Sequence, residues 1–111
     1  GFAQGFGGAL LEELVYSKEA QLLTGSFMDY LLPTSVEMPA KVDICLVQEA
    51  RSPHNPLGAK GAGEGGTVGV GAAIANAVED ALAPLDVRIN SLPLSPNAIF
   101  ELVRASRKGD L

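Results

Sequence analysis

The sequence predicts an α+β fold, in which short strands and packed helices surround a glycine-rich loop. Apolar residues recur at helical spacing in three stretches, over residues 1–14, 67–83 and 96–108. Residues 41–48 alternate between apolar and polar positions as a half-buried strand does. Between this strand and the second helix lies a stretch rich in glycine, residues 55–71.

Length and composition limit the possible classes of protein. A chain of 111 residues forms at most one domain, and a chain of this size has room for a core. Its 47% hydrophobic content excludes a disordered chain, and its apolar runs are too short to span a membrane. A net charge of −5 disfavours binding to nucleic acid or to an anionic membrane, because neither is attracted to an acidic surface.

The cysteine and histidine content excludes two kinds of site. The single cysteine, Cys45, cannot form an internal disulfide, and the single histidine, His54, leaves no cluster with metal-ligand spacing. We interpret Cys45 as a small buried residue and His54 as a loop residue. A reducing, cytoplasmic compartment is expected.

The first helix is predicted from Phe2, Phe6, Leu10 and Leu14, which repeat every four residues. Glycines interrupt it, and each costs about 1 kcal/mol relative to alanine inside a helix. We therefore expect these glycines to let another backbone or a ligand approach closely. With no capping residue, initiator methionine or signal peptide before it, we expect the chain to be a segment of a longer protein.

Three short β elements are predicted after this helix. Residues 14–24 contain two β-prone runs around the polar turn 17–20 and indicate a hairpin. Residues 41–48 indicate a strand, and residues 85–92 are a second strand candidate.

The two remaining helices differ in character. Residues 67–83 are apolar on several faces, which predicts a buried helix with Thr67 as its N-cap. Ser95 and Pro96 supply an N-cap and a proline at the first helical position for the last helix, which Gly109 is predicted to end.

The glycine-rich loop contains seven glycines in seventeen positions and a single acid, Glu64. So many glycines expose the backbone and carry an entropic cost, which indicates a loop that contacts a ligand. From the loop alone, Glu64 is equally well interpreted as a solvated acid or as a catalytic base. Lys60 likewise faces either a phosphate or solvent.

The run Gly58-Ala-Lys-Gly-Ala-Gly-Glu64 resembles a signature of the xanthine dehydrogenase/aldehyde oxidase family of molybdenum hydroxylases. In that family it lies near the C-terminal end of the large, molybdopterin-binding subunit. Other blocks resemble the family in the same order: residues 2–7, Glu12, Glu13 and Tyr16, residues 28–34, and Pro39. The resemblance extends to Ala105 and is nearest to carbon-monoxide-dehydrogenase-like large subunits. It implies that residues 1–111 are a C-terminal segment of a molybdenum-cofactor-binding domain.

The resemblance also implies an activity and a set of site residues. It implies oxidation of CO, an aldehyde or an N-heterocycle with water as the oxygen source, and Cys45 does not match the family's copper-binding cysteine. It implies molybdopterin, in its plain or cytosine dinucleotide form, with molybdenum, and [2Fe–2S] clusters and FAD on partner subunits or domains. Glu64 then acts as the general base, and Gln4 hydrogen-bonds the pterin, although a helix-surface glutamine is an alternative. The resemblance also implies that the cofactor is contacted by the backbone of Gly61, Gly63, Gly65, Gly66 and Thr67.

Two other functions are weighed against this one. Gly61 to Gly66 fit the G-x-G-x-x-G dinucleotide pattern, with Asp86 20 residues further on. That interpretation is disfavoured because no buried strand precedes Gly61 and a carboxylate in the turn would repel a pyrophosphate. A non-catalytic structural or assembly segment of a molybdenum hydroxylase complex remains open, and the metal and pterin content of the protein distinguishes it from an enzyme.

Overall fold

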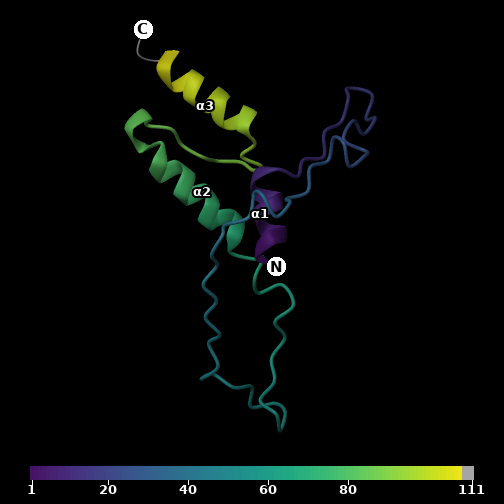
Figure 1. Ribbon diagram of the computed structural model, residues 1–111, viewed down its shortest axis with the longest axis vertical. Helices are drawn as coiled ribbons and strands as arrows, with labels where there is room; N and C mark the ends of the chain where they lie inside the picture. The colour runs from purple at the N-terminus through teal and green to yellow at the C-terminus, as the bar shows by residue number, and fades with distance from the viewer. Residues whose placement is uncertain (109–111) are drawn as a thin grey trace.

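The structure, a computed structural model, describes residues 1–108 and is built from helices and irregular chain. Its elements are α1 (Phe2–Leu10), α2 (Val70–Ala81), the 3₁₀ turn η1 (Ala83–Leu85) and α3 (Pro96–Lys108). Figure 1 shows the helices grouped together, with a long loop extending away from them. None of the described helices is long and apolar enough to cross a membrane.

The first two helices meet through glycine. A Cβ atom placed on Gly5 would lie 2.6 Å from the Val70 Cβ, and one placed on Gly1 would lie 3.0 Å from the Gly66 Cα. A Cβ at Gly5 would clash and one at Gly1 would be tighter than ordinary contact, so glycine allows α1 to approach the start of α2. The predicted close approach is therefore confirmed at these two positions, whereas Gly8 faces open space.

Residues 1–108 do not enclose a core of their own. The accessible surface of the chain is 8831 Å², whereas a compact monomer of this mass exposes roughly 5,800 Å². Its radius of gyration is 18.3 Å, against about 13 Å for a compact domain of this length. The buried apolar residues are few: Ala9, Val70, Val87 and Leu94.

Helix α2 differs from its prediction in burial and in its first residue. Among its residues only Val70 is buried, and Ala72, Ala73 and Ala77 are exposed. The described chain has too few other elements to cover every face of α2, so its predicted burial requires the rest of a larger protein and stays a prediction. Thr67 is not the N-cap, because α2 begins at Val70 after Gly69 and has no side-chain cap.

Neither predicted strand forms within residues 1–108. Residues 41–48 are extended, but all are exposed and none takes part in a backbone hydrogen bond. Alternation identifies the side chains that suit burial but supplies no neighbouring strand. Leu85 ends η1 and residues 86–92 are irregular, with the Ile89 N–H donating to Glu79 Oε2 at 2.8 Å rather than to a neighbouring strand.

The hairpin prediction is met in a minimal form. A single antiparallel bridge joins Tyr16 and Leu22, and the Leu23 N–H donates to the Val15 carbonyl at 2.8 Å. The segment that follows returns to the end of α1, where the Tyr30 hydroxyl donates to Glu12 Oε2 at 2.5 Å. Helix α1 itself ends earlier than predicted, at Leu10.

The last helix follows its prediction closely. The Ala98 N–H donates to Ser95 Oγ at 3.2 Å, which confirms Ser95 as the N-cap, and Pro96 is the first helical residue. Ile99, Leu102 and Val103 are half-buried on the inner side. The predicted end at Gly109 lies outside the described residues. Next to this cap, the Leu94 N–H donates to the Ala9 carbonyl at 2.6 Å and joins the α3 end of the chain to α1.

Candidate active site

Glu64 begins a tight turn that leads into α2. The N–H groups of Thr67 and Val68 donate to the Glu64 carbonyl at 2.9 and 3.2 Å, and the Gly65 N–H donates to the Ala62 carbonyl at 3.3 Å. The Glu64 side chain is exposed. Residues 62–69, which we call the acid turn, therefore have a defined backbone, while the carboxylate remains available to a ligand.

The acid turn lies against the first turn of α1. Gly66 is in backbone contact with Gly1, and the Thr67 hydroxyl donates to the Gly1 carbonyl at 2.9 Å. Two blocks that are more than 60 residues apart in sequence thus meet in space. Gln4, on the same short helix, is exposed. Gly8, one helical turn further along the same face, has open space around it, so the Gln4 face of α1 is bare.

The backbone donors of the loop divide into two groups. Within residues 1–108, the N–H groups of Gly61, Gly63 and Gly66 have no hydrogen-bond acceptor. The N–H groups of Gly65 and Thr67 instead donate to carbonyls of the acid turn. A Cβ on Gly61 or Gly63 would meet no atom within 4 Å, so a ligand can reach this backbone directly. A carboxylate, a side-chain amide and free N–H groups form a donor and acceptor set that suits a polar cofactor such as a pterin.

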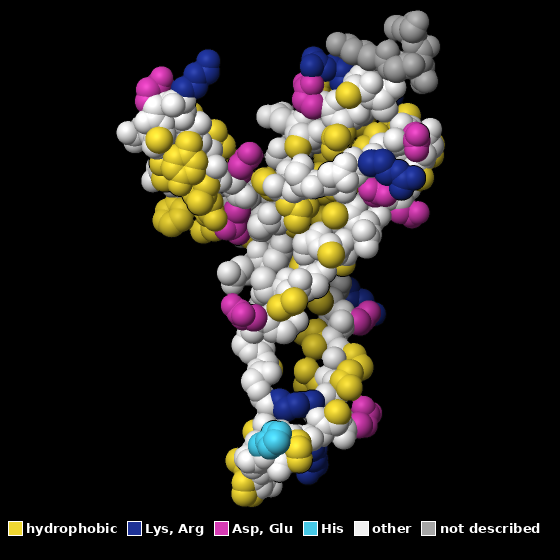
Figure 2. All heavy atoms as spheres, turned by 180° about the vertical axis from the view of Figure 1, so that it is seen from behind, with side chains coloured by type: hydrophobic (Ala, Val, Ile, Leu, Met, Phe, Trp, Pro, Cys, Tyr) yellow, Lys and Arg dark blue, Asp and Glu magenta, His cyan; other side chains and the backbone are white. Residues whose placement is uncertain are grey.

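A hollow of about 650 Å³ lies between the two limbs of the long loop. Arg51 and Lys60 both line it, and neither Glu64 nor Gln4 does. In Figure 2 an opening separates the two limbs, with basic side chains and the single histidine at its lower end. The full lining is Leu46, Val47, Gln48, Arg51, Leu57, Gly58, Lys60, Gly61, Ala62 and Gly65.

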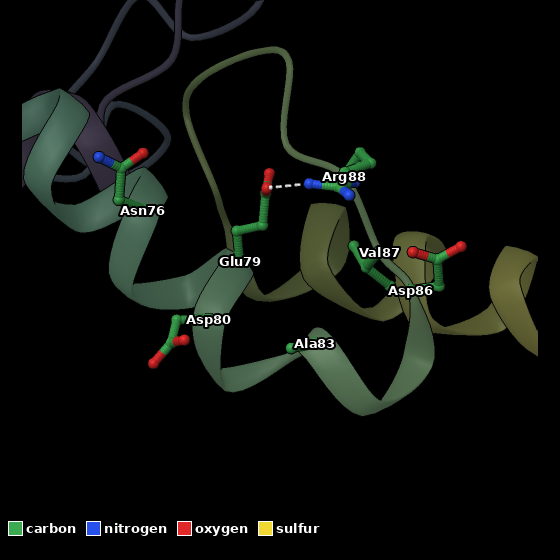
Figure 3. A pocket seen from close by; sticks show the side chains of 7 residues that line it. All are labelled: Asn76, Glu79, Asp80, Ala83, Asp86, Val87 and Arg88. Carbon is green, nitrogen blue, oxygen red and sulfur yellow. Dashed lines mark hydrogen bonds and ion pairs between the residues drawn. The ribbon is translucent and has the colours of Figure 1, made fainter.

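A second hollow, of about 420 Å³, lies beside α2 and η1 and is shown in Figure 3. Glu79 points across it to Arg88, with 3.0 Å between Oε1 and Nη1. The Ile89 N–H, followed by the Arg88 guanidinium, holds the pKa of Glu79 below its usual value. These contacts fasten residues 86–89 to α2 and are structural. Asp86 lines this hollow in a left-handed conformation, with φ 48°.

The remaining candidates of the sequence lie on the long loop. Cys45 is exposed rather than buried, so its prediction as a small core residue is wrong for the described chain. His54 and Lys60 are exposed as well. In the described part of the chain, no three His, Cys, Asp or Glu side chains gather into a possible metal site. No strand precedes Gly61 among these residues, and a dinucleotide-binding turn requires one.

Similarity to known proteins is extensive. A family model of the molybdopterin cofactor-binding domain matches residues 1–39. The chain is 49% identical over 107 residues to the gamma subunit of the 6-hydroxypseudooxynicotine dehydrogenase complex of Paenarthrobacter nicotinovorans, covering 96% of this chain and 13% of that subunit. It is 39% identical over 94 residues to the carbon monoxide dehydrogenase large chain of Afipia carboxidovorans, covering 84% of this chain and 11% of that one. The chain belongs to the molybdenum hydroxylase large-subunit family.

A solved structure of this family has the same course of chain. Quinoline 2-oxidoreductase from Pseudomonas putida 86 superimposes with a TM-score of 0.83 and 42% identity, over 93% of this chain and 13% of that one. The chain thus spans about an eighth of the length of the large subunits that it matches. A segment of the much longer quinoline 2-oxidoreductase chain therefore has the same elongated shape as residues 1–108.

Sequence reasoning did not find the hydrogen bond between Thr67 and Gly1. Helical spacing assigned Thr67 to the cap of α2, whereas its hydroxyl serves the first turn of α1. A partner 66 residues away leaves no local pattern. The glycines at positions 1 and 5 were the only signal that another segment would pack against α1.

Proposed function

We propose that this chain is a C-terminal segment, residues 1–111, of a molybdenum-cofactor-binding domain in a hydroxylase large subunit. The observation that supports this proposal best is the contact between the acid turn and the first turn of α1. That contact joins the two blocks that resemble the family's cofactor-binding and catalytic motifs, one carrying Gln4 and the other Glu64. The complete enzyme oxidises CO, an aldehyde or an N-heterocycle and takes the oxygen from water.

The residues of the chain have distinct roles in this proposal. The molybdenum cofactor, molybdopterin in its plain or cytosine dinucleotide form, supplies the two-electron redox chemistry. The amide of Gln4 and the free N–H groups of Gly61, Gly63 and Gly66 bind its polar atoms, since these donors have no acceptor in residues 1–108. Gly65 and Thr67 hold the backbone of the acid turn in the conformation that presents these donors.

Glu64 is the proposed general base. Its carboxylate accepts a proton from the water whose oxygen is transferred to the substrate, and a positioned base of this kind contributes about 10²–10⁴-fold to a rate. The glycines on both sides leave the carboxylate free of side-chain neighbours within the loop. The remainder of the large subunit encloses this position and excludes bulk water from it.

The proposed partners are inferred from the electrons that the reaction releases. Oxidation of the substrate releases two electrons, and the single cysteine of this chain cannot hold an iron–sulfur cluster. The proposal therefore includes [2Fe–2S] clusters and FAD on partner subunits or domains, in a cytoplasmic complex. The relatives of this chain are themselves named as subunits or large chains.

The test is a Glu64→Gln substitution in the complete large subunit. Glutamine keeps the size and hydrogen bonding of glutamate but cannot accept the proton, so kcat falls by about 10²–10⁴-fold while molybdenum content is unchanged. Glu49→Gln, at an exposed acid of the long loop, is the matched control and leaves both quantities unchanged. Near-normal kcat in fully loaded Glu64→Gln enzyme contradicts the catalytic role, and it favours the alternative of a non-catalytic segment. Loss of the metal from this variant assigns Glu64 a structural role instead.

A further inference from the structure

Thr67 makes hydrogen bonds to three separate parts of the chain. Its hydroxyl donates to the Gly1 carbonyl at 2.9 Å, and its N–H donates to the Glu64 carbonyl at 2.9 Å. Its own carbonyl accepts from the Val70 N–H at 3.1 Å. One residue thus connects α1, the residue that carries the acid, and the first residue of α2.

Around Thr67, the two backbones meet at glycines, and the Val70 side chain packs on Gly5. Gly1, Gly5 and Gly66 bring the two backbones together but offer no side chain that could fix their relative position. Across residues 1–108, the Thr67 hydroxyl makes the sole hydrogen bond between the acid turn and α1. This bond therefore helps to fix the register of the acid turn on α1, beside the packing of the Val70 side chain on Gly5.

The acceptor of this bond lies in the turn of helix that carries Gln4. The Gly1 carbonyl also accepts the first helical hydrogen bond, from the Gly5 N–H at 3.0 Å. Thr67 therefore binds the first turn of α1, in which Gln4 directly precedes Gly5. The separation between Gln4 and Glu64 thus depends on this side chain together with the packing of Val70 on Gly5.

We propose that Thr67 is a positioning residue, whose hydroxyl holds the acid turn on α1 and so sets Glu64 against the cofactor bound by Gln4. This inference rests on the proposed function for its catalytic meaning, but the hydrogen bond is a property of the chain alone. A displacement of about 1 Å at a reacting group can cost about 10²-fold in rate, so loss of the bond affects turnover although Thr67 does no chemistry.

The experiment compares four variants of the complete large subunit: Thr67→Val, Thr67→Ala, Thr67→Ser and Thr24→Val. Valine keeps the shape of threonine and removes the hydroxyl, whereas serine keeps the hydroxyl. Thr24→Val is the matched control, because the Thr24 hydroxyl also donates to a backbone carbonyl, that of Glu13 at 2.8 Å, away from the acid turn. The readouts are amide hydrogen exchange of residues 64–70, molybdenum content, kcat and KM.

Thr67→Val is expected to speed exchange of the Thr67 and Val70 amides by about three- to tenfold, the effect of one lost hydrogen bond. It lowers kcat more than it raises KM and leaves the molybdenum content unchanged. Thr67→Ser restores both exchange and kcat, and Thr24→Val leaves the acid turn unchanged. Thr67→Ala repeats the test with a smaller side chain that cannot clash.

Unchanged exchange in Thr67→Val and Thr67→Ala overturns the proposal. Failure of both variants to assemble, while Thr67→Ser assembles, also contradicts it, because the hydroxyl then serves folding rather than positioning. Hydrogen exchange is measured without turnover. The proposal for Thr67 and the proposal for Glu64 can therefore be contradicted independently of each other. A normal rate in Glu64→Gln removes the catalytic proposal and leaves the hydrogen bond in place.

Discussion

Two regions of this chain differ in how many of their packing and hydrogen-bond contacts are made within the chain itself. The framework, residues 1–11 and 69–108, holds the three α-helices of the described residues and is joined by specific contacts such as Leu94 to Ala9 and Arg88 to Glu79. The arm, residues 38–62, extends away from it in Figure 1 and has no helix or strand. Its large apolar side chains face outward, with Ile44 80% and Leu57 84% exposed.

The difference shows which sequence patterns form structure only when another segment packs beside them. Helix caps and glycine contacts act between parts of the framework, and the framework forms from this chain. The apolar alternation of the arm has no counterpart within residues 1–108, and exposed apolar surface of this extent marks an interaction site. The same course of chain lies inside the much longer quinoline 2-oxidoreductase chain. We infer that the remainder of a large subunit covers the arm.

The largest expected effect is on the metal. The 111-residue chain purified alone should contain no molybdenum and should self-associate through its exposed apolar surface, because the arm and the acid turn lack their neighbours. The complete subunit should hold molybdenum stoichiometrically. Elemental mass spectrometry and light scattering measure the two properties. Stoichiometric molybdenum in the isolated chain would show that residues 1–111 alone form the cofactor site.

A pair of glycines on α1 tests the framework contact. In Gly5→Ala the new Cβ would lie 2.6 Å from the Val70 Cβ, and overpacking of this kind costs about 1–3 kcal/mol. Gly8→Ala places its Cβ in open space and should stabilise the helix by about 0.5–1 kcal/mol, since alanine is the better helix former. Denaturant unfolding of the complete subunit, followed at α1, compares the two. Equal effects would mean that α1 does not pack on α2 as described.

Much of the framework was predictable from sequence, because its signals are local. Spacing and the Ser95–Pro96 pair identified α3 together with its cap, and four-residue spacing identified α1. The start of α2 was misplaced because the hydroxyl of Thr67 bonds to a residue 66 positions away. Neither the pairing of residues 41–48 nor the burial of α2 can be decided by a pattern that omits the neighbouring chain.

The candidate site was predictable only through resemblance. The glycine loop on its own left Glu64 undecided between a solvated acid and a base. Nothing local to Gln4 distinguishes it from a surface glutamine. The structure adds that their two segments touch, through Gly1 and Gly66. The roles of the individual residues stay predictions.

A smaller effect concerns pH and the framework. Because the Ile89 N–H and the Arg88 guanidinium lower the pKa of Glu79, the folded state favours its charged form. The contact therefore stabilises the fold above the usual pKa of 4.5, and the stabilisation is lost as pH falls through the lowered pKa. The melting temperatures of wild-type subunit and Glu79→Gln should differ near neutral pH and converge in acid. Glu101→Gln, which removes an exposed pair with Arg104, is the control. A difference that persists at low pH contradicts this assignment.

The central claim is that the framework makes its helix contacts within this chain, whereas the arm is paired by the rest of a large subunit. Amide hydrogen exchange of residues 41–48, compared between the complete subunit and the isolated chain at low concentration, tests it most directly. We predict that these amides exchange at least about a hundredfold more slowly in the complete subunit, because backbone pairing protects them. The amides of α2 should differ much less between the two samples. Equally fast exchange of residues 41–48 in both samples would contradict the claim.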